Sequence, residues 1–247
     1  MKAYIRIKHT GEFFDTSCYY AYAGCESLGI PVVTYKAVYS ISNNAPEDPV
    51  IGTVSDVKVA LEKFGIKLEP LDYPDELMPF TGRKIWKSTL FTVTSHSDAW
   101  HVFVKPVEEI KRFQGTVLDK SEDLIKLGGG LEDIEIWCSE KVHFISEWRL
   151  WILNGDIIGL SPYKGRWDVF PDTDVLRKAV QAYQNGPAAY ALDFGICDDG
   201  RTLLVEVSDG YALASFGLEP QLYMKVLAAR WKELTKSAEK QMCNFLP

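Results

Sequence analysis

The sequence feature that most constrains the fold is a pair of apolar runs separated by a short polar turn. Residues 189–196 read AYALDFGI, residues 202–209 read TLLVEVSD, and the turn between them contains CDDG. This pattern predicts an antiparallel hairpin whose strands lie in a core. Each strand nevertheless carries one carboxylate, Asp193 or Glu206, where an apolar side chain would be expected. The fold therefore has to supply partners for two charges in or beside its core.

Two interpretations explain these carboxylates. Antiparallel pairing brings Asp193 and Glu206 near one another, and a cation between them would relieve their repulsion. Mg²⁺ suits such a place, because it takes oxygen ligands from one or two carboxylates and completes its shell with water and substrate phosphates. In the alternative, Asp193 caps a strand and Glu206 pairs with an arginine such as Arg149. Strand alternation puts Ser208 on the face of Glu206 and Asp209 on the opposite face.

A lysine at the end of another apolar strand is the second candidate. Residues 101–107 read HVFVKPV, so Pro106 follows Lys105 and fixes the backbone there. Such a lysine can place one positive charge in a cleft and reach phosphate oxygens, whereas the alternative is a strand-end lysine in solvent. The next residues include Lys111 and Arg112, in a basic turn that either closes over a nucleotide or is an ordinary exposed loop.

The segment SEWRLWIL, residues 146–153, is the third candidate. Glu147 and Arg149 are two residues apart, so they point to the same face of a strand. The residues of the opposite face are apolar: Trp148, Leu150 and Ile152. Such a strand is expected either to line a polar cleft or to carry a surface ion pair. The segment SPYKGRW would extend the polar surface with Tyr163, Lys164 and Arg166.

The remaining patterns predict an α/β (α+β) fold. Residues 2–8, 32–38 and 50–54 alternate like strands, and residues 16–28 and 55–65 read as helices, the second with Ser55 as its N-cap. This alternation is typical of a layer with parallel strands. Residues 81–93 are expected to begin as a helix, residues 134–163 are rich in strands with a tight NGD turn, and residues 172–186 and 218–242 read as helices. A proline-marked connection at residues 70–80 predicts a division into residues 1–75 and 76–247.

Charge and cysteine content narrow the class of protein. The 247 residues carry 27 basic and 34 acidic side chains, a formal net charge of −7, which argues against a nucleic-acid-binding surface. The five cysteines are scattered and odd in number, which favours free thiols in a reducing compartment over disulfides. Because we find no secretory signal and no long apolar run, we expect a cytoplasmic protein outside the membrane. The four histidines share no motif and are expected to be structural or at the surface.

Taken in order along the chain, the polar motifs resemble the ATP-grasp superfamily. The order is VFVKP, then EIWCSEKVHFISEWRLWI, then ALDFGICDDGRTLLVEVSDG. The pattern is most similar to the compact R2K clade, whose members carry an EVNDGY-like segment, and it covers roughly residues 80 to 220. The resemblance implies an ATP-grasp fold, with an N-terminal pre-ATP-grasp-like α/β layer followed by two α+β lobes that sandwich ATP. The small lobe would span about residues 80–138 and the large lobe about residues 139–247.

The resemblance also implies roles for individual residues. Lys105 and Arg149 would be catalytic, and both would contact the nucleotide. Other nucleotide contacts would come from a hinge segment that holds adenine through backbone groups and from two polar residues of the large lobe: Ile136, Trp137, Cys138 and Ser139, then Glu147 and Lys164. Magnesium would be held by Asp193, Glu206 and Ser208.

The sequence departs from the family pattern at three places. Ser208 stands where an asparagine is usual, and a hydroxyl is a poorer ligand for magnesium than an amide oxygen. The usual glycine-rich flap after Lys105 is absent. The second phosphate-binding lysine of many members has no clear match, and Lys84 and Lys87 are candidates.

The activity that the resemblance implies is an ADP-forming ligase that uses ATP and Mg²⁺. It would join a carboxylate to an amine through an acylphosphate, with a small molecule or a peptide as substrate. No nucleic-acid or membrane partner is expected, and the assembly expected is a homodimer. Two alternatives are a nucleotide-binding or peptide-binding module that no longer catalyses, and a kinase that phosphorylates a small molecule.

Overall fold

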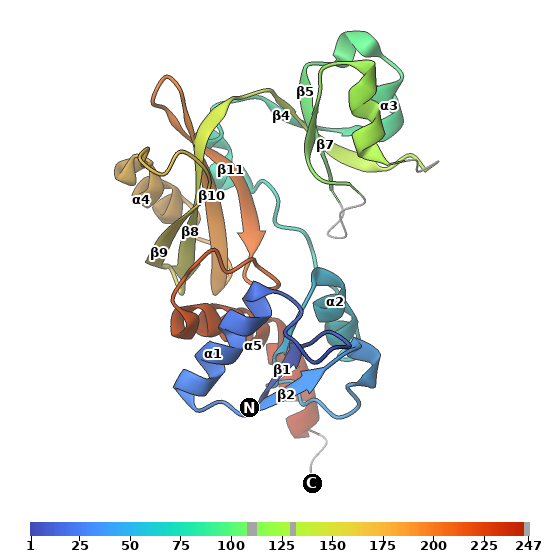
Figure 1. The fold of residues 1–247 in the computed structure, drawn as a ribbon, viewed down its shortest axis with the longest axis vertical. Helices are drawn as coiled ribbons and strands as arrows, with labels where there is room; N and C mark the ends of the chain where they lie inside the picture. The colour runs from blue at the N-terminus through green and yellow to red at the C-terminus, as the bar shows by residue number, and fades with distance from the viewer. Residues whose placement is uncertain (108–112, 129–131, 245–247) are drawn as a thin grey trace.

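The computed structural model describes residues 1–107, 113–128 and 132–244, and these residues form three β-sheets (Figure 1). A three-stranded parallel sheet lies at the bottom of the view. Above it lies a four-stranded antiparallel sheet, here called the large sheet, and a second four-stranded antiparallel sheet, the small sheet, stands at the upper right. The chain builds the N-terminal layer first, then the small sheet, then the large sheet, and then a long helix that returns to the N-terminal layer.

The N-terminal layer alternates strands and helices, as its sequence predicts. Its sheet has the order β2-β1-β3, with β1 (Ala3–Arg6), β2 (Val32–Tyr35) and β3 (Val50–Ile51) all parallel. The helices of the layer are α1 (Thr16–Leu28), α2 (Val54–Glu62) and the short 3-10 helix η1 (Val38–Ser40).

Helix α2 has Thr53 as its N-cap, so the prediction of Ser55 was wrong. The Thr53 hydroxyl accepts a hydrogen bond from the backbone N–H of Asp56, and the Asp56 carboxylate accepts one from the backbone N–H of Thr53. This reciprocal pair satisfies two backbone donors at once, which a cap two residues later could not do. Arg6 of β1 also binds the Asp56 carboxylate at 2.6 Å, so the helix start is tied to the sheet.

The small sheet has the order β4-β7-β5-β6. Its strands are β4 (Ile85–Thr89), β5 (Val102–Pro106), β6 (Thr116–Leu118) and β7 (Glu135–Glu140). Short helices lie before and around it: η2 (Asp75–Phe80), α3 (Leu90–Thr94), η3 (Ser97–Ala99) and η4 (Ser121–Leu127). The prediction that residues 81–93 begin as a helix was wrong, because β4 pairs with β7 and the helix starts only after Thr89. Pairing with a distant strand overrides local propensity here.

The large sheet has the order β11-β10-β8-β9. Its strands are β8 (Phe144–Leu153), β9 (Asp156–Gly165), β10 (Ala189–Cys197) and β11 (Thr202–Asp209), and helix α4 (Thr173–Ala182) precedes β10. Asn154 and Gly155 have φ of +52° and +86°, as the predicted tight turn between β8 and β9 requires. The predicted hairpin around CDDG is confirmed as β10 and β11, with Cys197 as the last residue of β10. One face of the sheet packs on α4 in a core that includes Leu150, Leu192 and Leu176.

The opposite face of the large sheet packs on helix α5 (Pro220–Asn244) and, through it, on α1. One apolar core joins Cys25 of α1, Trp151 of β8 and Met224 of α5. The two helices approach so closely that a Cβ on Gly24 would lie 2.2 Å from the carbonyl oxygen of Pro220. This core contains residues from both sides of the predicted boundary at residue 75, and the division into two domains stays a prediction.

Two further findings concern the described residues alone. Every helix there is too short or too polar to serve as a transmembrane span. The cysteines whose side chains are described are all buried and unpaired: Cys18, Cys25, Cys138 and Cys197.

Candidate functional site

A row of charged side chains crosses one face of the large sheet. The register places Asp193 of β10 opposite Arg149 of β8 on one side and opposite Glu206 of β11 on the other. Arg149 and Asp193 are 6% and 2% exposed, and the guanidinium donates two hydrogen bonds to the carboxylate, Nε to Oδ1 at 2.8 Å and Nη2 to Oδ2 at 2.7 Å. The same face is apolar farther along, where it meets α5. The sheet therefore carries core packing and a charged site on one surface.

Burial and pairing act in opposite directions on the two groups of this pair. Burial raises the pKa of Asp193, and the hydrogen bonds from Arg149 oppose that rise. Burial likewise works against the charge on Arg149, but the hydrogen bonds to Asp193 and the charges of Asp193 and Glu206 raise its pKa above the ordinary value. The alternative in which Glu206 takes Arg149 as its ion-pair partner was wrong, because Asp193 holds that arginine.

Glu147 lies on the same face and is held by its own neighbours. Its carboxylate accepts hydrogen bonds from the Tyr163 hydroxyl at 2.9 Å and from the Lys164 ammonium. The Tyr163 ring stacks on Phe216, with ring centroids 4.8 Å apart and planes 11° apart. Phe216 also packs against the Arg149 guanidinium, whose Cζ lies 4.7 Å from the centre of the Phe216 ring. The segment that follows β11 thus folds over the charged row and covers the arginine.

Lys105 of β5 reaches this row from the small sheet. The residue is only 5% exposed, so the interpretation as a solvated strand-end lysine was wrong. Its Nζ lies 3.2 Å from Glu206 Oε2 and 3.0 Å from Asp72 Oδ1, and 4.5 Å from the centre of the Tyr73 ring. Burial lowers the pKa of Lys105, but the charges of Glu206, Tyr73 and Asp72 outweigh burial and raise the pKa above its ordinary value. The lysine is therefore a buried cation between two carboxylates.

Asp72 is a site residue that the sequence reasoning missed. Besides its ion pair with Lys105, its Oδ2 accepts a hydrogen bond from Trp137 Nε1 at 2.6 Å, and its carbonyl oxygen accepts one from the Val207 N–H at 3.3 Å. Its φ is +36°, in a region that Asp and Asn tolerate better than most residues. The residue lies in the connector before η2, where nothing in the adjacent sequence marks it. Its contacts form only when the connector packs against both the small sheet and the large sheet.

The predicted adenine segment, residues 136–139, needs a correction. These residues lie on β7, which pairs with β4 on one side and with β5 on the other. The backbone groups of a central strand are already engaged in its two ladders, so they cannot also hold adenine. Ile136 and Cys138 are fully buried in the core of the small lobe, and Ser139 is also buried. The indole N–H of Trp137 donates to Asp72, so this side chain connects the segment to the charged site.

The predicted alternation along β11 is confirmed. The Ser208 hydroxyl lies 3.5 Å from Arg149 Nη2, on the face of Glu206. Asp209 points the other way and binds Arg230 of α5 through two contacts, at 2.5 Å and 2.7 Å. Asp209 therefore belongs to the packing of α5 and not to the charged row.

The other basic residues that were candidates for the site contact aromatic rings or acidic side chains. Lys87 lies over the Trp137 ring at 4.9 Å, whereas Lys84 lies over Trp86 at 5.3 Å. Arg166 forms an exposed pair with Asp168. Lys111 and Arg112 lie outside the described residues.

Part of the predicted donor set fits a magnesium ion that arrives with a nucleotide: Glu206 and Ser208 line a cavity, whereas both oxygens of Asp193 accept hydrogen bonds from Arg149. Asp193 and Glu206 face one another across the hairpin, and carboxylate oxygens are the ligands that this ion prefers. No group of three or more His, Cys, Asp or Glu side chains that could hold a metal ion occurs in the part of the chain that the structure describes. An ion here would thus need phosphate oxygens and water to complete its shell, as magnesium does in nucleotide sites.

A cavity of about 260 Å³ lies in front of the charged groups. Its lining includes Asp72 and Lys105 from one side and Arg149, Glu206 and Ser208 from the large sheet. Residues 211–214 form part of its wall, and they also line a second cavity of about 140 Å³ on the side of the N-terminal layer. One short segment therefore separates the charged cavity from a smaller one.

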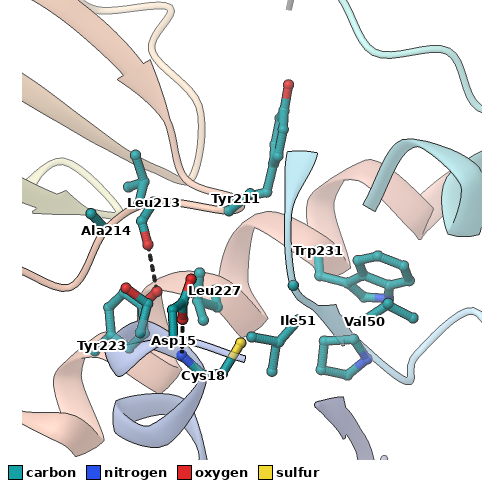
Figure 2. Close-up of a pocket in the computed structure, with 14 residues that line it drawn as sticks. Asp15, Cys18, Val50, Ile51, Tyr211, Leu213, Ala214, Tyr223, Leu227 and Trp231 are labelled. Atoms are coloured by element: carbon teal, nitrogen blue, oxygen red, sulfur yellow. Dashed lines mark hydrogen bonds between the residues drawn. The ribbon is translucent and has the colours of Figure 1, made fainter. Parts of the chain in front are cut away.

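The second cavity is mostly apolar (Figure 2). Its walls come from α1, β3, residues 211–214 and α5, and they include Ile51, Leu227 and Trp231. The polar groups are few. The Asp15 carboxylate accepts a hydrogen bond from the Cys18 N–H at 2.8 Å and caps α1, and the Tyr223 hydroxyl donates to the Leu213 carbonyl at 2.6 Å.

The architecture is shared with solved ligases, and these likenesses identify the fold. D-alanine–D-alanine ligase from Bacillus anthracis aligns at a TM-score of 0.59 and 10% identity, over 98% of this chain and 99% of that chain. N5-carboxyaminoimidazole synthetase from Staphylococcus aureus aligns at 0.58 and 10%, over 95% and 77%. D-cycloserine synthetase DcsG aligns at 0.55 and 11%, over 95% and 100%. The parallel N-terminal sheet and two antiparallel sheets with helices are the ATP-grasp fold, as the motifs predicted.

A family model classifies the chain more specifically than its fold does. Residues 80–226, more than half of the chain, match the family model described as ATP-grasp domain, R2K clade family 2. The chain therefore belongs to this family, which confirms the resemblance drawn from its motifs. None of the curated proteins matches the sequence.

Proposed function

We propose that this protein is an ADP-forming ligase that joins a carboxylate to an amine at the expense of ATP. The observation that carries the proposal is the arrangement of charge around one cavity. Lys105 enters it from the small sheet, and Arg149, Asp193 and Glu206 lie in a row across the large sheet. Phosphoryl transfer to a carboxylate brings anions together, so it needs fixed cations rather than a strong base.

Each charged residue has a role in this proposal. The Lys105 ammonium binds phosphate oxygens as a compact charge. Asp193 holds the Arg149 guanidinium in one orientation through Nε and Nη2, while Nη1 makes only a 3.4 Å contact to the Ala214 carbonyl. That edge is the one that can turn to the transferring phosphoryl group, for which a planar guanidinium is suited. Glu147 keeps Tyr163 and Lys164 beside it.

The reaction would proceed in two steps that share this cavity. A substrate carboxylate oxygen attacks the γ-phosphorus, and the bond to the β,γ-bridging oxygen breaks, which gives an acylphosphate and ADP. An amine then attacks the acyl carbon, phosphate leaves, and the nitrogen loses a proton to give the amide. Holding the reactants in position supplies much of the rate enhancement, so no dedicated base is required.

Magnesium, held by Glu206 with Ser208 beside it, would neutralise charge on the phosphates when bound, and Asp193 would join the shell by giving up one of its hydrogen bonds to Arg149. The residues Asp72 and Lys105 complete the walls of the same cavity. We place the adenine next to Trp137 and the connection between β7 and β8, because the backbone of β7 itself is fully used. The acyl acceptor enters from the side of residues 211–214, where the smaller cavity suits a small, largely apolar substituent of a molecule or of a peptide.

The test is a ligation assay on the whole chain. The protein is mixed with ATP, Mg²⁺ and pools of amino acids and short peptides, and phosphate release and product mass are followed. A ligase gives phosphate release that depends on substrate, and a product whose mass equals two substrates minus one water. ATP that binds with no turnover in any pool would instead support a module that no longer catalyses.

Two alternatives are kept because single observations favour them. Ser208, in place of an amide ligand, favours a nucleotide-binding module with weakened metal binding. The small size of the second cavity favours a kinase that phosphorylates one small molecule. Product mass separates the kinase, because its product gains a phosphoryl group and no second substrate is joined.

A further inference from the structure

Strand β11 departs from strict alternation immediately before Glu206. Asp193 of β10 pairs with Glu206. The next residue of β10, Phe194, pairs with Leu204 and not with Val205, which is therefore an extra residue on β11. Such an extra residue is a β-bulge, which bends the strand and changes the direction of the side chains beside it. The bulge lies next to a residue of the charged row, and bulges are common beside active sites.

The bulge determines which way the Glu206 side chain points. Leu204 and Val207 are three residues apart, yet both lie in the apolar core between the large sheet and α4. Glu206, which lies between them, faces Asp193 in the charged row. Strict alternation would place Leu204 and Glu206 on the same face, so either the leucine would enter the charged row or the carboxylate would enter the core. The bulge allows both side chains to take their proper faces.

The bulge is held from outside the sheet by Arg83, which lies between η2 and β4. Its Nη1 donates to the Leu204 carbonyl at 2.7 Å, and its Nη2 donates to the Val205 carbonyl at 3.0 Å. Successive carbonyls of a regular strand point to opposite sides, so one guanidinium could not bind both of them without the bulge. On its outer side, β11 has no neighbouring strand in the part of the chain that the structure describes. The arginine therefore supplies donors that a neighbouring strand would otherwise supply.

The surroundings of Arg83 indicate a role other than ion pairing. Among the residues that the structure describes, it donates to backbone carbonyls and forms no ion pair with a carboxylate. Burial lowers the pKa of Arg83, and its interaction with Tyr73 opposes this change. The Tyr73 ring lies against Lys105, so the arginine is connected to the charged site both through β11 and through this ring.

We propose that Arg83 is a positioning residue, which holds the bulge at Val205 and so directs the Glu206 carboxylate toward Lys105 and the proposed magnesium site. It acts through the backbone of β11 and touches neither nucleotide nor substrate. The inference rests on the proposed binding of magnesium by Glu206. Groups that orient a metal ligand change metal affinity by about 10- to 100-fold when they are removed.

The experiment measures how magnesium promotes the binding of ADP. The protein is titrated with ADP by calorimetry at a series of Mg²⁺ concentrations, and the quantity compared is the concentration that gives half of the full gain in affinity. Arg83→Met removes the donors and leaves no carboxylate without its cation, and circular dichroism checks that it folds. We expect the half-maximal concentration to rise about tenfold or more. The matched control is Arg177→Met, which breaks an exposed pair with Asp174 on α4 and should leave the concentration unchanged.

Two further variants separate positioning from a general effect on the fold. Glu206→Gln raises the same concentration by itself, because it removes the charge of the ligand. If Arg83 acts through Glu206, adding Arg83→Met to Glu206→Gln should change the concentration by less than about twofold, whereas independent effects would add in full. Arg83→Lys keeps the positive charge but lacks the planar fork that binds two carbonyls, so it should give an intermediate rise.

The outcomes distinguish this inference from the proposed function. An unchanged concentration in folded Arg83→Met, or full additivity in the double variant, overturns the inference while the proposed ligase stands. If Arg83→Met does not fold, Arg83→Lys decides, and an unchanged concentration in that variant overturns the inference. If the unaltered protein binds ADP equally with and without Mg²⁺, the proposed magnesium site falls, and this inference falls with it.

Discussion

The two antiparallel sheets bring charge to the same cavity in different ways. In the large sheet, Arg149 finds Asp193 on the neighbouring strand, so register alone satisfies the pair. In the small sheet, Lys105 has no partner on its own sheet among the described residues. Its carboxylates come from the connector, Asp72, and from the large sheet, Glu206. The large sheet therefore carries a site that forms when the sheet folds, whereas the lysine is positioned only when the lobes are together.

The largest expected effect is on the stability of the large sheet. Arg149→Ala leaves the Asp193 carboxylate buried without its cation, which costs about 3–5 kcal/mol of unfolding free energy. Urea denaturation followed by circular dichroism measures it. Arg166→Ala breaks an exposed pair with Asp168 and should leave the midpoint unchanged. Equal midpoints for the two variants would show that the Arg149–Asp193 pair does not stabilise the large sheet.

The next effect is on turnover and leaves the fold in place. Glu206→Gln keeps the shape of the side chain and removes one charge from the proposed metal shell, so turnover should fall about 10²- to 10³-fold. Phosphate release under saturating ATP and Mg²⁺ is the measurement. The control is Glu26→Gln, which alters an exposed carboxylate on α1. Turnover within twofold of the unaltered protein would remove Glu206 from the site.

A smaller effect is expected on nucleotide affinity from the small sheet. Lys105→Met keeps an apolar stem over Tyr73 and removes the charge, so MgATP should bind about 10- to 100-fold more weakly, since a charge-assisted contact contributes about 1.5–3 kcal/mol. Calorimetric titration measures it, and Lys232→Met, on an exposed lysine of α5, is the control. Because Asp72 and Glu206 are more exposed than Asp193, water can solvate them once the lysine is removed, so the denaturation midpoint should fall less than in Arg149→Ala. A loss of folded structure would mean that the lysine holds the lobes together and is not mainly a ligand group.

The smallest effect concerns the magnesium requirement. Ser208→Asn supplies an amide oxygen on the face of Glu206, and this is a better ligand for a hard cation than a hydroxyl. We expect the magnesium concentration at half-maximal turnover to fall a few-fold. Ser208→Ala, which removes the hydroxyl without replacing it, should not lower it. If the asparagine and alanine variants titrate alike, Ser208 lies outside the metal shell.

The sequence predicts the large sheet well because strand alternation carries its information locally. The faces of Glu147, Arg149, Glu206 and Ser208 follow from a period of two residues, and the structure has them on one face. Alternation does not predict which charged side chain on a neighbouring strand each residue pairs with. Arg149 pairs with Asp193 and not with Glu206, because the strand order places β10 next to β8.

The small lobe was predicted less well, because its arrangement depends on contacts distant in sequence. The central position of β7 results from pairing with β4 and β5, which removes the backbone of residues 136–139 from consideration as an adenine site. Asp72 gives no signal in a proline-marked connector, since its partner Lys105 lies in another element. The start of β4 was mistaken for a helix for the same reason.

A ribosome releases α1 long before α5. Until Pro220 and the residues after it emerge, the surface of α1 around Gly24 and Cys25 has no helix to pack against, and the three-stranded sheet has only part of its core. Contacts between elements so far apart in the chain form late and slowly. The nascent chain thus exposes apolar surface until α5 emerges, and such surface promotes aggregation or chaperone binding. The contact between α1 and α5 therefore couples completion of the core of the N-terminal layer to the emergence of α5.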